Sequence, residues 1–329
     1  MHQGRKTTIG VENLTAIALA STRNMTREQW LEYRKLGIGG SDVSAIAGMN
    51  RWKSPIEVWM EKTGQLESKE LGEAAYWGTM LEDVVAREYA KRSGLRVQKR
   101  NAILQHPKHT FMLANVDRII HDKDRGRGIL ECKTTNEYKK GEWEEEKIPE
   151  EYAIQVHHYL AVTGLQFARI AVLIGGNKFE IKDIERDEEI IDYLVKIESD
   201  FWQKVQNNTP PEIDGSASST ELLKYLYPNS NQSSIELPEA GSMVEEFLML
   251  QEMEKTIGTK KDSIANQIKQ MMGENETAYT LTHKIGWKSL ITNRFDTNRF
   301  KTAHKDLYKE FVNETPSRRF TVGDIKKLK

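Results

Sequence analysis

The chain has 329 residues, 38% of them hydrophobic and 29% charged, which is enough for one large core and a smaller module. No stretch approaches the ~18 uninterrupted apolar residues of a membrane span, and Met1 to Ala20 lacks the apolar core of a secretory signal. The single cysteine, Cys132, excludes a disulfide framework and a four-thiolate iron–sulfur cluster, so we expect a reducing cytoplasm. A formal net charge of −1 means that a DNA binder of this sequence must concentrate its positive charge in a groove or channel.

The first predicted elements surround a glycine-rich turn. Residues 1–25 are polar and unpatterned, and we expect a flexible N-terminal arm there. Thr26 and Gln29 match a capping box, which predicts a helix over 27–36 with Arg34 near its end.

The turn itself, over 37–42, opens a predicted short helix through Ala47 with Ser41 at its N-cap. Backbone N–H groups, a hydroxyl and the positive end of a helix dipole favour a bound phosphate. An ordinary helix start after a turn has the same pattern, so both interpretations stand at this point. A second capping box at Ser54 predicts a helix that stops at Gly64.

A longer helix is predicted over 77–93, where Gly94 ends it. Glu82 lies at the border of its apolar stripe, a position that suits either a functional carboxylate or an ordinary solvated one. Basic residues accompany the next segment, over 96–104, which we interpret as the first strand of a sheet.

Two strands joined by a turn are predicted next, over 111–120 and 128–135, with Asp124 in the turn between them. The first strand carries one carboxylate, Asp117. A hairpin of this length can bring Asp117 beside Glu131 on the second strand.

The second strand places three functional groups in a row. Side chains alternate across a strand, so Glu131 and Lys133 share one face while Cys132 points to the other. Two carboxylates and an ammonium at one sheet end suit a hard divalent cation and a water held ready to attack.

Beyond the hairpin, the acidic run over 142–147 is interpreted as a solvated loop or helix edge. A helix is predicted over 150–163, and the spacing of Tyr152 and Gln155 puts them on one face. His157 and His158 are interpreted as surface or packing residues, because no third ligand lies at a metal-binding spacing. Further elements are predicted at 167–174 (strand), 178–182 (strand) and 190–205 (helix).

The chain then changes character. Residues 207–220 form the best linker candidate, separating a domain over 26–206 from an accessory region over 221–329. Apolar residues at near-heptad spacing predict a long helix over 238–272, which we expect to pack on the preceding domain. A short hairpin and a basic tail follow, and the region also suits a DNA-facing module, an assembly arm or a docking site.

On pattern alone, the carboxylate hairpin fits either a metal nuclease or structural ion pairs in an α/β domain. Its helix–strand–strand–helix context is the core order of the PD-(D/E)xK nucleases. We therefore expect a restriction-endonuclease-like core, with a central mixed β-sheet flanked by helices, and a mainly helical C-terminal extension.

The sequence also resembles the YqaJ-type viral recombinases, the phage alkaline exonucleases that include the lambda-exonuclease type. The resemblance covers roughly residues 26–200, with a weaker match near the C-terminus. Its motifs, in chain order, are Leu36-Gly-Ile-Gly-Gly-Ser-Asp-Val-Ser-Ala-Ile-Ala-Gly48, Trp77-Gly-Thr-Met-Leu-Glu82, Asn115-Val-Asp117, Leu130-Glu-Cys-Lys-Thr134 and Tyr152-Ala-Ile-Gln155.

The resemblance implies a role for each matching residue. Asp117, Glu131 and the backbone carbonyl of Cys132 would hold Mg²⁺ or Mn²⁺, with Glu82 joining directly or through water. Lys133 would orient the attacking water, a safer role than that of a base because its pKa would otherwise have to fall toward neutrality.

Further roles follow from the same resemblance. Gln155 and Tyr152 would pin the nucleophile, the lysine or the substrate backbone. Arg34 and Ser41 would grip a terminal 5′-phosphate. Asn115 stands where a small hydroxyl residue could also reach that phosphate, which leaves this third contact open.

The implied activity is a Mg²⁺-dependent 5′→3′ exonuclease on double-stranded DNA ends. It would release 5′-mononucleotides and leave 3′ tails for an annealing protein of the RecT or Redβ kind, inside a bacterial host, with a phage or prophage as the source. A homo-oligomeric ring, most simply a trimer, could line its channel with basic side chains: Lys91, Arg92, Lys99 and Arg100. The competing interpretations are a structure-specific or restriction-like endonuclease on the same fold and a non-catalytic DNA-binding accessory protein.

Overall fold

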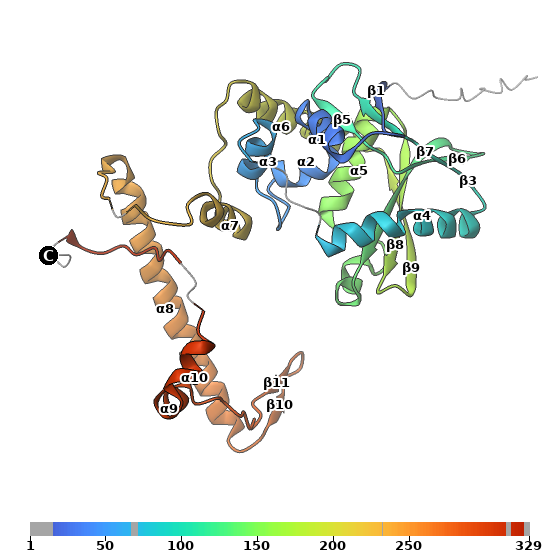
Figure 1. Ribbon diagram of the computed structural model, residues 1–329. Helices are drawn as coiled ribbons and strands as arrows, with labels where there is room; N and C mark the ends of the chain where they lie inside the picture. Colours follow the sequence, from blue (N-terminus) through green and yellow to red (C-terminus); the bar gives the residue numbers. More distant parts are fainter. Residues whose placement is uncertain (1–15, 67–71, 232, 314–316, 326–329) are drawn as a thin grey trace, which may run out of the picture. The chain divides into compact units, whose positions relative to one another are not determined.

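The computed structural model describes residues 16–66, 72–231, 233–313 and 317–325. The chain divides into two compact units, Met1–Leu223 and Lys224–Lys329 (Figure 1). All the candidate site residues named above belong to the first unit.

A five-stranded mixed sheet forms the centre of the first unit, in the order β3-β6-β7-β8-β9. Strands β7 and β8 are parallel, and the other neighbouring pairs are antiparallel. The strands span Arg96–Lys99 (β3), Arg118–Asp122 (β6), Gly126–Thr135 (β7), Phe167–Ile174 (β8) and Lys178–Glu185 (β9). The β-branched and aromatic residues of β8 suit a strand buried on both faces, and seven of its residues pair with β7 in register.

Helices cover the two faces of this sheet (Figure 1). Helix α4 (Glu73–Ser93) packs its buried Val85, Ala86 and Tyr89 against Leu130 and Phe167. Helix α5 (Glu150–Thr163) belongs to the larger core on the opposite face, where Ile129, Val156 and Leu160 are fully buried. The expected α/β class, a mixed sheet flanked by helices, is confirmed.

A second sheet of four strands lies beside the first, in the order β1-β4-β5-β2. Its strands are Ile17–Ser21 (β1), Ala102–Gln105 (β4), Met112–Ala114 (β5) and Ile38–Gly39 (β2). Two predictions are therefore wrong. Residues 17–21 are no flexible arm, because they pair with β4, while residues 1–15 lie outside the described part of the chain. The segment 96–104 is not one strand but two, β3 and β4, in different sheets.

The strand predicted over 111–120 is also two strands. Its first part is β5 in the four-stranded sheet, and its second part is β6 in the five-stranded sheet. The intervening residues, Asn115, Val116 and Asp117, carry the chain from one sheet to the other. Residues 111–120 are mostly apolar and contain no glycine or proline, which is why the sequence pattern did not reveal the crossing.

Three short helices precede α4. Helix α1 (Arg27–Lys35) begins at the predicted capping box of Thr26 and Gln29, and α3 (Pro55–Lys62) is capped by Ser54. Helix α2 (Gly40–Ile46) has Gly39, not Ser41, as its N-cap. The backbone N–H of Gly39 donates to the Asp42 carboxylate at 3.1 Å, so Asp42 performs the capping that was assigned to Ser41.

Two helices end the first unit, and α7 (Ala217–Leu226) continues past its boundary. Helix α6 (Glu188–Gln206) buries one amphipathic face, and α7 occupies part of the segment expected to be a linker. Ser218 is buried and donates to Glu57 of α3 at 3.3 Å, so this stretch is anchored and does not behave as a free connection. A 3₁₀ helix, η1 (Glu137–Trp143), buries Trp143 beside the acidic run that we expected to be solvated.

The second unit is organised around one long helix, α8 (Gly241–Met272), after a 3₁₀ turn, η2 (Pro238–Ala240). A short hairpin of β10 (Thr277–Tyr279) and β11 (Lys284–Gly286) follows, and then α9 (Thr297–Ala303) and α10 (Lys305–Glu310). Met272 is the one large hydrophobic side chain that the described part of this unit buries. Across the described residues, no helix has both the length and the apolar character to cross a membrane.

Candidate active site

The crossing between the two sheets brings the first pair of carboxylates together. Arg118 pairs with Leu130 at the end of β6, so Asp117, one residue earlier, lies beside Glu131. The backbone N–H of Cys132 donates to Asp117 Oδ2 at 2.8 Å and fixes the carboxylate at the sheet edge. The hairpin geometry expected for Asp117 and Glu131 is present.

Glu131, Lys133 and Gln155 form a closed triangle of hydrogen bonds on the α5 face of the sheet. Lys133 Nζ donates to Glu131 Oε1 at 2.8 Å and to Gln155 Oε1 at 3.1 Å. Gln155 Nε2 donates back to Glu131 Oε1, also at 2.8 Å. Each side chain therefore restrains the other two, which leaves little rotamer freedom for the lysine.

Lys133 is held in its charged form. Burial on its own would lower the pKa of its ammonium, but the Glu131 and Asp117 carboxylates outweigh it and raise that pKa above its ordinary value. The ammonium also lies 4.8 Å from the centre of the Tyr152 ring, which in turn stacks on Trp143. A charged lysine in this setting is suited to orienting a water or a phosphate oxygen.

The carboxylates have the character of a cation site. Glu131 is 3% exposed, yet its Oε2 is buried without a hydrogen-bond partner among the described residues. The pKa of Asp117 is raised well above its ordinary value, first by burial and then by the nearby Glu131 and Glu82. A divalent cation would satisfy the orphaned oxygen and offset the crowded negative charge, so the residues present fit the implied metal.

The donor set is nonetheless small. In the parts of the chain that the structure describes, no three His, Cys, Asp or Glu side chains gather as a ready metal cluster. Burial raises the pKa of the Cys132 thiol, so its sulfur stays protonated and leaves only the backbone carbonyl as a hard ligand. Asp117, Glu131 and that carbonyl are the residues here that would hold such a cation, with water supplying further ligands.

Glu82 reaches the site through an arginine that the sequence did not reveal. One amino group of Arg118, Nη1, donates to Glu82 Oε1 and to the backbone carbonyl of Asp117 at 2.6 Å, and the other binds Asp83. Arg118 thereby ties the α4 carboxylate to the metal-site strand. Its position directly after Asp117 is the one signal that could have indicated this role.

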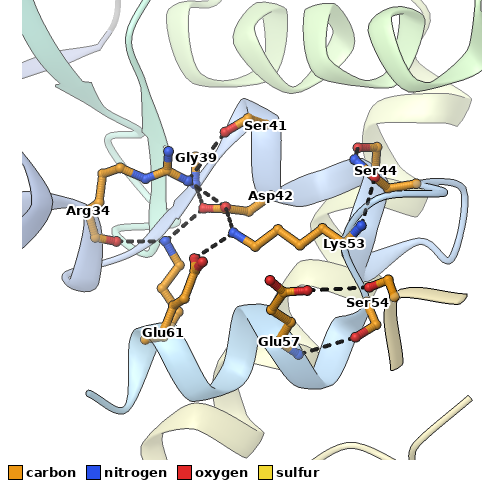
Figure 2. A network of polar contacts seen from close by, with 12 residues as sticks. Arg34, Gly39, Ser41, Asp42, Ser44, Lys53, Ser54, Glu57 and Glu61 are labelled. Atoms are coloured by element: carbon orange, nitrogen blue, oxygen red, sulfur yellow. Dashed lines mark hydrogen bonds and ion pairs between the residues drawn. The ribbon is translucent and has the colours of Figure 1, made fainter. Parts of the chain in front are cut away.

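A second site lies on the four-stranded sheet's side of the crossing. Arg34, Ser41 and Asn115, the three residues expected around a 5′-phosphate, line one small pocket of about 60 Å³. Arg34 Nη2 donates to Ser41 Oγ at 3.3 Å and also binds Asp42 (Figure 2). The guanidinium lies 5.0 Å from the centre of the Trp30 ring. Nη2 donates both hydrogen bonds that the Arg34 side chain makes to described residues, so the other N–H groups of the guanidinium are available to a ligand.

Asp42 is the centre of an ion cluster beneath this pocket (Figure 2). The carboxylate is fully buried and binds Arg34, Lys62 at 2.7 Å and Lys53 at 3.3 Å. Burial acts to raise the pKa of Asp42, but the three cations hold it well below its ordinary range. Lys53 also binds Glu61 at 2.5 Å, which leaves the cluster with one excess positive charge facing an anion-sized pocket.

The two sites are physically joined through α5. Tyr159 lines the Arg34 pocket, and its hydroxyl accepts from Gln155 Nε2 at 2.9 Å. Helix α2 approaches so closely that a Cβ on Gly40 would lie 2.4 Å from Tyr159 Cε1. Glycine at this position therefore permits the contact between the pocket helix and the helix that carries Gln155.

Comparison with known proteins assigns the family. A model described as the YqaJ-like viral recombinase domain matches residues 29–166, a range that contains every pocket and metal-site residue named above. The protein YqaJ of Bacillus subtilis (strain 168), itself described as uncharacterized, is 43% identical over 316 residues, or 94% of this chain and 98% of that protein. The chain belongs to the YqaJ-like viral recombinase family. Membership of this family, together with the paired carboxylates Asp117 and Glu131, supports a nuclease.

Solved structures similar to this YqaJ-like chain include two exonucleases. The alkaline exonuclease LHK-Exo from Laribacter hongkongensis is 21% identical, with a TM-score of 0.47, over 55% of this chain and 94% of that one. A phage-related exonuclease from Haemophilus somnus 129PT is 15% identical, with a TM-score of 0.43, over 54% of this chain and 99% of that one.

The basic residues expected to line a channel lie at one end of α4, on β3 and directly after β3 in this YqaJ-like fold. Lys91 is exposed, and Arg92 binds Glu88 while stacking over Phe179 at 4.6 Å. Lys99 reaches Asp83 at 3.7 Å. Arg100, by contrast, is half-buried, and its Nε lacks a partner among the described residues.

One further buried pair escaped the sequence analysis. His158, expected at the surface or in packing, is fully buried between Glu198 at 2.9 Å and the Leu113 carbonyl at 2.8 Å. It joins α5 to α6 and to β5, so it holds the scaffold that carries Gln155 and contacts neither site directly.

Proposed function

We propose that the protein is a metal-dependent 5′→3′ exonuclease on double-stranded DNA. At a duplex end it degrades the strand that terminates with its 5′ end, releasing 5′-mononucleotides and leaving 3′ single-stranded tails. The observation that carries this proposal is the hydrogen-bonded connection from Glu131 through Gln155 to Tyr159. It places a phosphate-sized cationic pocket beside a carboxylate site.

The chain's own residues supply most of the chemistry. Asp117, Glu131 and the Cys132 carbonyl would hold Mg²⁺, for which Mn²⁺ could substitute. Such a cation neutralises charge on phosphodiester oxygens and lowers the pKa of a bound water. Lys133 keeps its proton and, fixed by Glu131 and Gln155, orients the water and stabilises the negative charge that develops on the phosphate.

The pocket accounts for direction. Arg34 offers free guanidinium N–H groups and Ser41 a hydroxyl, and both suit the oxygens of a terminal phosphate. A phosphate held there fixes the next phosphodiester at the carboxylates, so cleavage begins at the 5′ end and removes one nucleotide at a time. Each new end carries a 5′-phosphate that can enter the same pocket.

The wider setting belongs to the same proposal. The 3′ tails would pass to a single-strand annealing protein of the RecT or Redβ kind in the cytoplasm of a bacterial host. A closed ring, most simply of three chains, would keep the enzyme on duplex DNA with Lys91, Arg92, Lys99 and Arg100 facing the channel. The domain boundaries proposed for this activity place the nuclease within residues 26–206.

The decisive experiment is digestion of a linear duplex in which the bases of the 5′-terminal and the 3′-terminal nucleotide of one strand carry distinguishable labels. Matched substrates carry either a 5′-phosphate or a 5′-hydroxyl, and each is incubated with Mg²⁺, with Mn²⁺ and with chelator. Metal-dependent release of mononucleotides, faster from the phosphorylated end, is expected. Mononucleotides released from the 3′ end instead, or release that continues in chelator, would contradict the proposal.

A closed circular duplex distinguishes this exonuclease activity from an endonuclease activity. An end-dependent exonuclease leaves the circle intact, whereas a structure-specific or restriction-like endonuclease on the same fold nicks or linearises it. Binding of DNA ends without any metal-dependent cleavage would indicate a non-catalytic accessory protein.

Two variants test the division of labour. Glu131→Ala should abolish cleavage while binding to DNA ends remains, because the pocket is untouched. Arg34→Ala should instead reduce the preference for 5′-phosphate and the processivity, with metal binding unchanged. If each variant lost cleavage and binding to DNA ends to the same extent, the two sites would not be separate.

A further inference from the structure

Helix α8 carries a heptad pattern in which seven of nine positions are apolar and two are charged. Starting at Met243, one face is built by alternate steps of four and three residues over the whole length of this 32-residue helix. The positions are Met243, Phe247, Leu250, Glu254, Ile257, Lys261, Ile264, Ile268 and Met271. Spacing of 3.5 residues is that of a helix whose apolar seam faces a second helix along its full length.

Within the second unit, most of this seam is exposed. Ile257 and Ile264 at its centre are 66% and 59% exposed. Neighbours approach only toward the two ends of the described helix, where the ring of Phe320 meets Phe247 edge-on at 5.6 Å, Ile268 is half-buried, and Met272, which lies off the seam, is buried. A row of apolar side chains this long is a mark of an interaction surface.

Two charged residues interrupt the seam and indicate which partner covers it. Glu254 and Lys261 are seven residues apart, about 10 Å along the axis, which is too far for an ion pair within one helix. Neither has an ion pair among the described residues. A partner helix must therefore supply a cation near Glu254 and an anion near Lys261, because a charge in such a seam is costly without a counter-charge.

A second α8 meets this demand in one orientation only. In a parallel, in-register pair, Glu254 faces Glu254 and Lys261 faces Lys261. In an antiparallel pair centred between these residues, Glu254 of each copy lies near Lys261 of the other.

The remaining charges agree with the antiparallel arrangement. The first half of α8 is mainly acidic, through Glu245, Glu246 and Glu252, and the second half is mainly basic, through Lys260 and Lys269. Lys255 and Asp262 are the exceptions. Antiparallel pairing sets the acidic half of one helix against the basic half of the other.

We propose that α8 is a homotypic pairing helix, which joins two copies of this chain as an antiparallel coiled coil with Glu254 of one copy beside Lys261 of the other. The contact is independent of the proposed nuclease activity. It is also independent of any ring that the nuclease units form, since it adds a two-fold contact to whatever assembly they make.

The test is the mass of the full-length protein in solution, measured by sedimentation or light scattering over a range of concentrations. Wild type should contain an even number of chains. Glu254→Lys and Lys261→Glu should each halve that mass, with a roughly tenfold or greater rise in the dissociation constant. Each pair of helices contains two contacts between residues 254 and 261, and either substitution turns both of them from attractive to repulsive. The double variant Glu254→Lys/Lys261→Glu should restore the wild-type mass.

Glu252→Lys is the matched control, because it makes the same charge change on the opposite side of the helix. It should leave the mass unchanged. Circular dichroism of each variant checks that α8 stays helical, and Ile257→Asp provides a second route to the half-mass state. Three outcomes would overturn the proposal: a monomeric wild type, in which the seam packs on its own nuclease unit; single variants of unchanged mass; or a double variant that stays dissociated, which would leave a different protein as the occupant.

Discussion

Gln155 Nε2 donates one hydrogen bond to Glu131 Oε1 at 2.8 Å and another to the Tyr159 hydroxyl at 2.9 Å. One amide group thus connects the carboxylate site to the wall of the Arg34 pocket. Because Gln155 is buried, its position is set by these two partners and by Lys133. The proposed cutting site and the proposed end-gripping site are coupled through a single side chain.

The first prediction concerns this coupling. Tyr159→Phe removes one hydrogen bond from Gln155, worth about 1 kcal/mol, and should slow cleavage by roughly three- to tenfold. Gln155→Ala removes the contacts to Glu131 and Lys133 as well, and should slow it by about two orders of magnitude. In the double variant the tyrosine change should add almost nothing, since its partner is gone. Single-turnover rates on a 5′-phosphorylated duplex measure this, and full additivity would argue against the connection.

Glu82 and Glu131 should differ in their effect on metal use. Glu131→Gln removes the oxygen that lacks a partner in the protein, and should eliminate metal-supported cleavage. Glu82 is held by Arg118, so Glu82→Gln should raise the Mg²⁺ concentration needed for half-maximal rate while leaving measurable activity. Titrations of the cleavage rate with Mg²⁺ distinguish the two variants. If both variants lost metal-supported cleavage equally, Glu82 would bind the metal as directly as Glu131.

Gly40 should tolerate no side chain. A Cβ there would lie 2.4 Å from Tyr159 Cε1, so Gly40→Ala should force α2 away from α5 and destabilise the nuclease unit by about 1–3 kcal/mol. The same shift should weaken the preference for 5′-phosphate. Gly258→Ala, where a Cβ meets open space in α8, is the control and should be neutral or slightly stabilising. Urea unfolding followed by tryptophan fluorescence gives the comparison.

Asp42→Asn should destabilise the protein in a pH-dependent way. The variant leaves the buried Lys62 and the half-buried Arg34 and Lys53 without their common anion, which should reduce the free energy of unfolding by about 3 kcal/mol near pH 7. The pKa of Asp42 is lowered in the folded state, so its carboxylate adds stability above the unfolded pKa and loses that contribution as the pH falls through the folded pKa.

The difference between wild type and Asp42→Asn should therefore narrow as the pH falls below the ordinary value of 3.8. Denaturation curves at a series of pH values measure it, with Asp262→Asn, an exposed carboxylate of α8, as the control that should show little difference at any pH. If the difference in the free energy of unfolding between wild type and Asp42→Asn widened as the pH fell, Asp42 would be protonated in the folded protein.

Local sequence patterns determined much of the nuclease core. The bounds of α5 and β8 agree with their predictions, because helical spacing closed by Gly164 and an unbroken β-branched run are strong, local signals. Period-two alternation on β7 likewise placed Glu131 and Lys133 on one face with Cys132 on the other.

Only the tertiary structure decided where the chain changes sheets and which charges meet. No local signal marks the crossing at Asn115–Asp117, yet it sets Asp117 beside Glu131 at the candidate metal site and Asn115 in the Arg34 pocket. Asp42, Lys53 and Lys62 meet across a turn and a helix, and Tyr159 reaches the pocket through a glycine contact with α2. Sequence by itself indicated the candidate reacting groups, since these follow from residue type and strand period. Their partners depend on long-range packing, which no short spacing encodes.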